Sequence, residues 1–160
     1  MDVASIVEKL DTGGTGLEIA IENLERDFNM GTIVRSANAF GVRHVHVIGR
    51  RQWNKRGAMA TDKYLHIHHY PTVDEFLTAS GDKKLIAIDN IPGSVPLAET
   101  ELPESCILIF GSEGNGISEQ LSAHAEKIVA IEQFGSTRSI NVGVAAGIAM
   151  YAWLQQHRLH

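Results

Sequence analysis

The sequence predicts an α/β fold, with a mostly parallel β-sheet covered by helices on both faces. Short apolar runs alternate with longer segments of helical periodicity along the whole chain, which is the pattern of repeated strand–helix units. Fifteen glycines and a hydrophobic share of 44% suit a packed core with many short loops. The 160 residues are most simply organised as one domain.

The strands are predicted from short runs that alternate or are uniformly apolar. Residues 17–23 (LEIAIEN) alternate apolar and polar side chains, which is typical of a strand. The other strands are expected at 45–48, 65–70, 85–89, 107–110 and 128–131. Helical segments separate most of these runs, so the strands should be parallel, and ligands of such sheets bind beyond the carboxyl ends of the strands. That rule places the residues after Ile109 and after Ile131 in one candidate crevice.

The helices are predicted between capping residues and stop signals. Asn29 can cap a helix over 29–40 that ends at Gly41, and Thr72 can cap the next helix, through about residue 79. Further helices are expected at 2–10, 118–125 and 140–157. The remaining stretches are a turn over 11–16, an ambiguous polar segment over 52–63 with a helical turn around Ala58, and a proline-bearing loop ending at Pro103.

Composition indicates a cytoplasmic protein. The single cysteine, Cys106, excludes an internal disulfide, and the first residues do not resemble a signal peptide. The longest apolar run, 142–154, is shorter than the ~20 residues that a membrane helix needs. No membrane association is therefore expected.

Basic residues are concentrated in one segment of an acidic chain. The net charge is −5, yet residues 41–66 contain six basic side chains and one acidic side chain. One basic face can bind a polyanion while the whole protein stays acidic. The candidate residues for binding such a polyanion are Arg43, Arg50, Arg51, Lys55 and Arg56. The alternative is a solvated basic loop.

The glycine-rich loop at residues 110–118 (FGSEGNGIS) predicts a nucleoside site rather than a triphosphate site. Gly111 and Gly116 have the spacing of a phosphate-binding loop, but Ile117 occupies the position that requires lysine. The glycines also fail the G-x-G-x-x-G dinucleotide pattern, and Glu113 would repel a polyphosphate. A neutral or cationic nucleoside fits better, and the alternative is a helix entry that only needs tight turns.

Three segments stand out: DFNMGTIVRSANAFGV (27–42), LIFGSEGNGIS (108–118) and IEQFGSTRSINVGVAAGIAMYAW (131–153). Together they resemble the three motifs of the SpoU class of SPOUT RNA methyltransferases. Residues 27–42 match the pattern Asn-x-Gly-x-x-x-Arg-x-Ala through Asn29, Gly31, Arg35 and Ala37. Residues 108–118 match the second motif through Phe110, Gly111, Glu113 and Gly116. Residues 131–153 match the third motif through Ser139, Ile140, Asn141, Val142, Val144 and Ala145. The resemblance covers roughly residues 17–157 and is carried by all three motifs in order.

The resemblance implies an enzyme that moves a methyl group from S-adenosylmethionine to a ribose 2′-hydroxyl of tRNA or rRNA. It also implies a homodimer and a C-terminal trefoil knot, which composition and periodicity could not indicate. Residues 17–160 would be a single catalytic domain after a short extension at 1–16. The alternative function is a SPOUT-like RNA-binding module with weak or lost catalysis, and methylation of a base also stays open. A compact substrate such as tRNA is mildly favoured.

The resemblance implies five catalytic residues: Arg35, Asn29, Glu113, Ser139 and Asn141. Arg35 would activate the 2′-hydroxyl. Because a guanidinium is effectively always protonated, we favour phosphate anchoring and oxyanion stabilisation over proton removal. Asn29 would orient the motif loop or Arg35, and Glu113 would hold Arg35 or a substrate hydroxyl. Ser139 and Asn141 stand at a helix start, where short polar side chains either cap the helix or meet a ligand.

The resemblance also implies a cofactor site formed largely by backbone groups. Its expected members are Phe110, Gly111, Ser112, Gly114, Gly116, Ile131, Gln133, Ile140 and Val144. Small residues let the main chain approach the ligand closely. The third motif usually opens with Ile-Pro and a hydrophobic residue, whereas this chain has Ile131-Glu132-Gln133, which should loosen the loop and put the charge of Glu132 near the adenine.

Two remaining patterns have two interpretations each. Gly143, Ala146, Gly147 and Met150 form a small-residue stripe that fits either a tight core or a homodimer interface, and periodicity favours the core. The histidine pairs at 44/46 and 66/68 lack a recognisable set of metal ligands, and methyl transfer needs no metal. We therefore expect no metal site, and a half-exposed strand face on which His44 or His46 borders the RNA.

Overall fold

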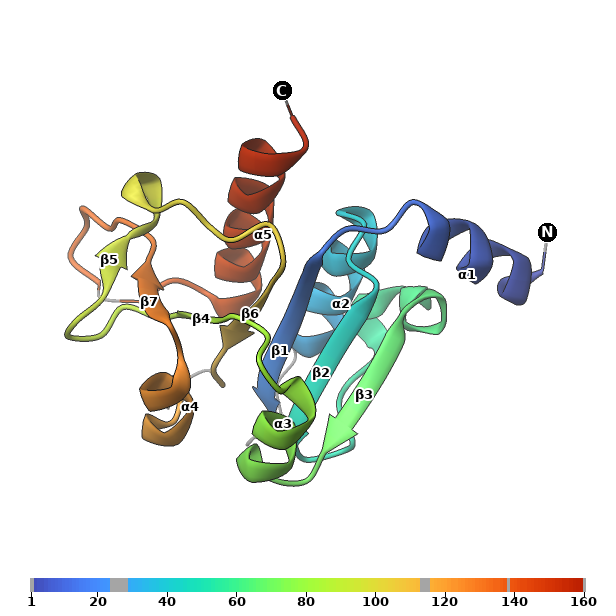
Figure 1. Cartoon of the computed structure of the whole chain (residues 1–160), viewed down its shortest axis with the longest axis horizontal. Coiled ribbons are helices and arrows are strands. Elements are labelled where there is room, and N and C mark those ends of the chain that lie inside the picture. The colour runs from blue at the N-terminus through green and yellow to red at the C-terminus, as the bar shows by residue number, and fades with distance from the viewer. Residues whose placement is uncertain (1, 24–28, 113–115, 138, 160) are drawn as a thin grey trace.

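A computed structural model describes residues 2–23, 29–112, 116–137 and 139–159. Their strands form one seven-stranded sheet in the order β3-β2-β1-β6-β4-β7-β5, and every pairing between them is parallel (Figure 1). The strands are β1 (Leu17–Asn23), β2 (His44–Gly49), β3 (His66–Tyr70), β4 (Leu85–Ile88), β5 (Val95–Pro96), β6 (Cys106–Phe110) and β7 (Lys127–Ala130). The predicted α/β class with a parallel sheet is confirmed.

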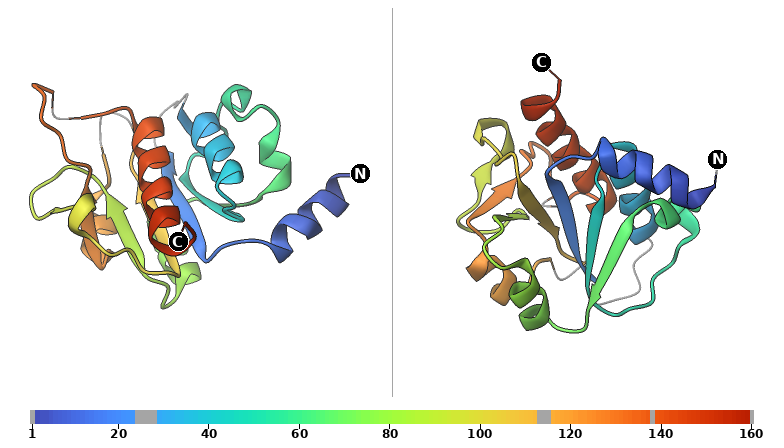
Figure 2. Two further views of the ribbon diagram at one scale, coloured as in Figure 1. Left: turned by 90° about the horizontal axis from the view of Figure 1, so that it is seen from above. Right: turned by 45° about the vertical axis from the view of Figure 1, so that its right-hand side comes forward.

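Helices cover both faces of the sheet. They are α1 (Val3–Thr12), α2 (Asn29–Ala39), α3 (Val73–Ser80), α4 (Glu119–His124) and α5 (Val142–His157), with short 3₁₀ turns η1 (Arg56–Ala58), η2 (Thr61–Tyr64) and η3 (Leu97–Glu99). Helices α2 and α5 lie side by side and pack on one face, while α3 and α4 pack on the other (Figure 2). Helix α1 contributes no buried residue and projects from the edge of the body near β3.

Alternating side chains of the strands build two core layers. On β1, Ile19 and Ile21 point to the layer under α2 and α5, and Ala20 points to the layer under α3 and α4. Strand β6 is buried along its whole length, which agrees with its position in the middle of the sheet. Its Cys106 is 2% exposed, and burial raises the pKa of the thiol to about 12, so the thiol stays protonated.

The structure adds one strand to the predicted set. Strand β5 contains only Val95 and Pro96, which pair with Val129 and Ala130 of β7, inside the segment predicted to be a proline-bearing loop. Two residues are too few to show a period of two, so the sequence pattern could not reveal this strand. The other predicted strands and helices are present, with ends that differ by a few residues.

The small-residue stripe of α5 faces the core in three of its four positions. Gly143, Ala146 and Met150 are buried, whereas a Cβ atom at Gly147 would meet nothing within 4 Å. Strand β6 lies between β1 and β4, and the knot stays a prediction. No helix in the described ranges is both long and apolar enough to cross a membrane.

Candidate active site

A pocket of about 560 Å³ lies beyond the carboxyl ends of β4 and β6 and against the start of α5. Its walls come from residues 88–91, 110–112 with 116, 131 with 133, and 139–142 with 145. The crevice expected after Ile109 and Ile131 is therefore present, and it draws on the second and third sequence motifs.

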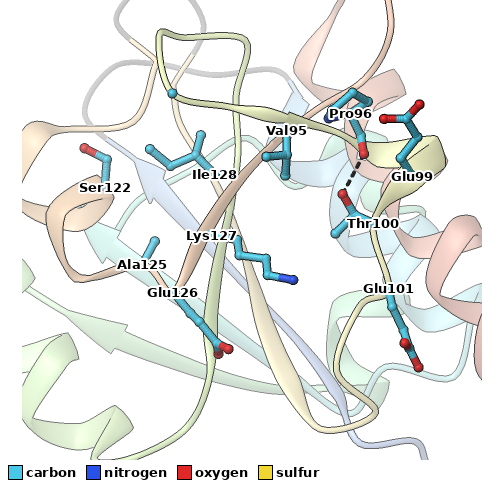
Figure 3. Close-up of a pocket in the computed structure, with 11 residues that line it drawn as sticks. Val95, Pro96, Glu99, Thr100, Glu101, Ser122, Ala125, Glu126, Lys127 and Ile128 are labelled. Atoms are coloured by element: carbon cyan, nitrogen blue, oxygen red, sulfur yellow. Dashed lines mark hydrogen bonds between the residues drawn. The ribbon is translucent and has the colours of Figure 1, made fainter.

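A second hollow, of about 580 Å³, lies at the β5 edge of the sheet (Figure 3). Glu99, Glu101, Glu126 and Lys127 line it, and the Thr100 hydroxyl donates a hydrogen bond to the Pro96 carbonyl there at 2.5 Å. It contains none of the residues singled out by the sequence motifs. The pocket beside the glycine-rich loop is thus the candidate active site.

The glycine-rich loop turns back on itself so tightly that Gly111 has no room for a side chain. A Cβ atom at Gly111 would lie 2.1 Å from the Gly116 carbonyl carbon and 2.4 Å from the Ile117 nitrogen. Gly116 has a φ of +66° and donates its N–H to the Ser112 carbonyl at 3.0 Å. Both glycines are thus required by the backbone, and they bring main-chain groups to the pocket wall.

Two carboxylates hold the exit of this loop. Asp89 Oδ2 accepts a hydrogen bond from the Ile117 N–H at 3.1 Å, and Glu22 Oε1 accepts one from the Ser118 N–H at 2.7 Å. Glu22 stands near the end of β1 and is 1% exposed, while Asp89 follows β4 and lines the pocket. The sequence motifs contain neither residue. Asp89 was predicted as the last residue of the strand at 85–89, so the rule about strand ends would have pointed to this position.

Two buried polar atoms at the pocket have no hydrogen-bond partner among the described residues. They are Ser112 Oγ and Gln133 Oε1, and both side chains line the cavity. A buried polar atom without a partner is costly, so each suits a ligand group that supplies one. The Gln133 oxygen can accept a hydrogen bond from an exocyclic amino group, and the Ser112 hydroxyl can pair with a ribose hydroxyl. These groups fit a nucleoside.

Asn141 both caps α5 and lines the pocket. Its Oδ1 accepts hydrogen bonds from the N–H groups of Gly143 at 2.9 Å and Val144 at 3.2 Å. The place of a Cβ at Gly143 lies 3.2 Å from Asn29 Oδ1 and 3.0 Å from Asn141 Oδ1. The missing side chain therefore lets the starts of α2 and α5 meet, which joins the first motif to the third. Ser139 lines the same pocket.

Arg35 stands apart from the pocket wall. It is exposed on α2, and its guanidinium makes no hydrogen bond or ion pair with any residue that the structure describes. The predicted partner Glu113 and the predicted cofactor residue Gly114 lie outside the described residues.

The pocket contains seven of the nine residues expected around a cofactor. They are Phe110, Gly111, Ser112, Gly116, Ile131, Gln133 and Ile140. Val144 is not among them, because it lies on the solvent side of α5 with 55% of its surface exposed. Glu132 also points elsewhere, since its carboxylate accepts hydrogen bonds from the Ala98 N–H at 3.2 and 3.3 Å. Gln133 lines the pocket, and Glu132 does not.

Four of the five predicted RNA-binding residues are exposed: Arg50, Arg51, Lys55 and Arg56. The prediction that Arg43 binds RNA was wrong. Arg43 is 5% exposed, its Nε pairs with Asp11 at 2.8 Å, and its Nη2 donates to the Tyr64 carbonyl at 2.6 Å. Its charge is used to dock α1 and η2 onto the sheet, so it is not available to RNA.

The segment that carries these four exposed residues is fixed to both β1 and α2. Asn23, 1% exposed at the end of β1, donates its side-chain N–H groups to the carbonyls of Arg50 at 2.7 Å and Gln52 at 3.1 Å. A Cβ at Gly31 of α2 would lie 2.9 Å from the Gly57 nitrogen, so only glycine permits this contact. The basic segment is thereby held beside the helix that carries Arg35.

Four histidines on β2 and β3 form a stacked strip. The rings alternate between β3 and β2, and neighbouring centroids lie 5.0 to 5.7 Å apart. Their order is His66, His44, His68, His46 and Tyr70. His46 is 6% exposed and therefore does not border a surface, whereas His44 is half-buried. Among the described residues, no group of three or more histidine, cysteine and acidic side chains could hold a metal ion.

Comparison with known proteins identifies the same family as the three sequence motifs. Residues 16–151 match the model of the SpoU rRNA Methylase family. A tRNA/rRNA methyltransferase of Mycobacterium sp. (strain KMS), itself uncharacterised, is 28% identical over 155 residues, which cover 91% of this chain and 48% of the relative. The tRNA (guanosine(18)-2′-O)-methyltransferase of Escherichia coli K12 is 24% identical over 161 residues, covering 97% of this chain and 70% of that protein. The chain thus spans about half the length of the mycobacterial relative.

Solved structures share the fold. The TrmH/SpoU tRNA modifying enzyme of A. aeolicus superposes with a TM-score of 0.83 at 23% identity, covering 98% of this chain and 85% of that chain. The SpoU methyltransferase AviRb of Streptomyces viridochromogenes, in complex with AdoMet, gives a TM-score of 0.79 at 21% identity, covering 89% and 61%.

Proposed function

The chain belongs to the SpoU rRNA Methylase family, and we propose that it transfers a methyl group from S-adenosylmethionine to a ribose 2′-hydroxyl of tRNA or rRNA. The observation that carries the proposal is the meeting of the three motifs. The second and third line one nucleoside-sized pocket, and Asn29 of the first lies beside Gly143 in α5, the helix whose first turn lines that pocket. The relatives named as tRNA or rRNA methyltransferases support the same reaction.

The pocket residues fit S-adenosylmethionine, which supplies an electrophilic methyl group when bound. Main-chain groups of the loop at Gly111 and Gly116 would contact the nucleoside, and Ser112 and Gln133 would satisfy its hydroxyl and amino groups. A ligand that carries a sulfonium cation and no phosphate also agrees with a loop that lacks the lysine of a phosphate site. The structure known for AviRb with AdoMet supports this choice.

Arg35 is proposed to act on the acceptor ribose. An in-line displacement needs an alkoxide-like oxygen close to the methyl group, and positioning with charge stabilisation supplies most of the acceleration. The exposed guanidinium of Arg35 would hold an RNA phosphate beside the 2′-hydroxyl and stabilise its developing negative charge. Asn29, Ser139 and Asn141 would position the motif loops around the acceptor, and Glu113 is proposed to hold Arg35 or a substrate hydroxyl.

RNA is proposed to lie over the basic segment beside α2. Arg50, Arg51, Lys55 and Arg56 are exposed there, and the contacts of Asn23 and Gly31 fix the segment relative to Arg35. Basic side chains on one face would bind the phosphate backbone despite the net charge of −5. Which nucleotide is methylated would depend on further contacts.

A homodimer is proposed to form through α5. The solvent side of this helix presents Val144, Ile148 and Tyr151, which are 55%, 40% and 49% exposed and recur at helical spacing. Gly147 lies on the same side with open space above it. An apolar helix face of this kind is typical of an interface between copies.

A methyl-transfer assay tests the proposed function. Purified protein with labelled S-adenosylmethionine should label unfractionated tRNA or rRNA, and Arg35→Ala should abolish labelling while cofactor binding by calorimetry stays within about twofold. If the wild-type protein binds the cofactor and RNA yet labels neither RNA, the chain is an RNA-binding module instead. If it binds no S-adenosylmethionine, the assignment of the pocket is wrong.

A further inference from the structure

Met59 follows the basic residues Lys55 and Arg56, is exposed to solvent and has an unusual backbone conformation. Its side chain is 65% exposed, and it is followed by Ala60, so that two consecutive non-glycine residues have positive φ values of 52° and 63°. No other non-glycine residue in the described ranges has a positive φ. A left-handed backbone is unfavourable for residues that carry a Cβ atom, so this conformation persists only if its surroundings impose it.

The surroundings of Met59 do impose it. The Met59 N–H donates to the Arg56 carbonyl at 3.3 Å, and the Thr61 hydroxyl donates to the Ala58 carbonyl at 2.5 Å. Ala58 is fully buried against the core under α2. The turn is therefore closed on both sides of Met59, with its base fixed inside the protein.

The base of the turn also contacts the helix that carries Arg35. A Cβ at Gly31 would lie 2.8 Å from the Ala58 nitrogen, and one at Gly57 would lie 3.1 Å from the Thr32 nitrogen. Such close backbone contact leaves the turn little freedom to move along α2. Met59 is thus presented at a fixed place relative to Arg35, which stands one turn further along the same helix.

The side chains around Met59 indicate which ligand group would contact it. Lys55 and Arg56 are exposed within four residues of it and would hold an RNA backbone. An apolar, polarisable side chain among these cations is suited to the face of an unstacked nucleobase, since methionine sulfur makes favourable contacts with aromatic rings. A base inside a duplex is stacked on both faces and offers no such surface.

We propose that Met59 contacts an unpaired nucleobase of the substrate RNA, and that its left-handed backbone is kept for this purpose. The contact would favour single-stranded loops over continuous duplexes near the ribose on which Arg35 acts. The inference rests on the proposed RNA methyltransferase function and adds a specificity-determining residue to it.

The test compares two RNA probes against three proteins. The probes are a stem–loop with an unpaired loop and a continuous duplex of the same length, and the proteins are wild type, Met59→Gly and Met59→Leu. Met59→Gly should bind the stem–loop up to about tenfold more weakly, with unchanged affinity for the duplex, because it removes the contact between the methionine side chain and the base but no charge. Met59→Leu should keep affinity within about threefold, because it retains an apolar side chain.

Two further readouts separate this role from a structural one. Met59→Gly should unfold about 2–4 °C higher than wild type, because glycine relieves the left-handed strain. Its stem–loop affinity should keep the wild-type dependence on salt, whereas Arg56→Ala should reduce that dependence. A stabilised variant that binds more weakly cannot have lost affinity by unfolding.

The inference is overturned if Met59→Gly binds both probes as wild type does, or if it loses affinity equally for both. A wild-type protein that methylates RNA while Met59→Gly behaves identically would leave the proposed function standing without this contact. A wild-type protein that binds neither probe nor any tRNA or rRNA would refute both.

Discussion

Gly111 illustrates how a single residue fixes the shape of the pocket. Its missing side chain leaves room for the backbone of Gly116 and Ile117, which would stand within 2.4 Å of a Cβ atom. Gly111→Ala should therefore displace the loop and weaken S-adenosylmethionine binding by more than about tenfold, measured by calorimetry. Gly13→Ala is the matched control, because a Cβ there would meet only the Lys9 carbonyl oxygen, at 4.0 Å, and Gly13 does not line the pocket. Equal affinity in the two variants would show that the loop does not form the cofactor site.

At the residue scale, sequence patterns predicted what the backbone requires better than where side chains point. Gly111 and Gly116 were predicted from spacing, and both are sterically required. Arg43 and Glu132 were assigned by charge and position, yet they bond to Asp11 and to the Ala98 N–H. Such partners come from distant parts of the chain, so local sequence could not indicate them.

The histidine strip is an element-scale feature that makes stability depend on pH. Burial lowers the pKa of His44 and His68 below 6.5, so the unfolded chain takes up protons at these positions more readily than the folded one. Stability should therefore fall as the pH drops below about 6.5, because protonation favours the unfolded chain.

Glu18 on β1 makes the stability depend on pH in a second, more acidic range. Burial raises its pKa, but hydrogen bonds from His46 at 2.6 Å and Lys83 at 2.9 Å outweigh burial and lower it from 4.5 to about 2. Its contribution, on the order of 2–3 kcal/mol, should be complete above pH 4.5 and lost as the pH falls toward 2. Urea unfolding of wild type and Glu18→Gln at pH 7 and pH 3 measures this, and the variant should lose less stability between the two. An equal loss would show that the His46–Glu18–Lys83 contacts contribute nothing.

The basic segment makes RNA affinity depend on salt. Neutralising its four exposed residues to alanine should weaken RNA binding at low salt and reduce the slope of log affinity against log salt by up to about 3, if each contacts one phosphate. The four residues are Arg50, Arg51, Lys55 and Arg56. Neutralising Lys84 and Lys127, which are exposed elsewhere, is the control and should leave the slope unchanged. An unchanged slope in the fourfold variant would indicate a solvated loop.

At the element scale, the predicted strands and helices are present because each is long enough to show its own period. Helix α5 and strand β1 are clear in the sequence, and Asn141 caps α5 as short polar residues at helix starts commonly do. Strand β5 was missed and the segment that contains η2 was left ambiguous, whereas the helical turn predicted around Ala58 is present as η1. They are held by contacts with β7 and α2, which no local period records.

At the scale of the whole molecule, the apolar face of α5 predicts the oligomeric state. Val144→Asp should convert a dimer into a monomer in light scattering, because it places a charge in an apolar interface. Val95→Asp is the matched control, since Val95 is 41% exposed on β5 and away from α5. Wild-type protein that is already monomeric at micromolar concentration would contradict the proposed interface.

The order of the strands could not be predicted from the residues alone. The positions of β6 between β1 and β4, and of β7 between β4 and β5, depend on long-range pairing. The rule about strand ends supplied the expectation of a crevice after Ile109 and Ile131, and resemblance to a family supplied the identity of its cofactor. The knot and the dimer remain predictions at this scale.

The central claim is that the pocket and Arg35 direct a methyl group to ribose rather than to a base. Mass spectrometry of nucleosides from RNA incubated with the protein and S-adenosylmethionine tests it most directly. We predict a 2′-O-methylated nucleoside that appears with wild-type protein and is absent with Arg35→Ala. A product methylated on its base, or a ribose product that persists in Arg35→Ala, would contradict the claim.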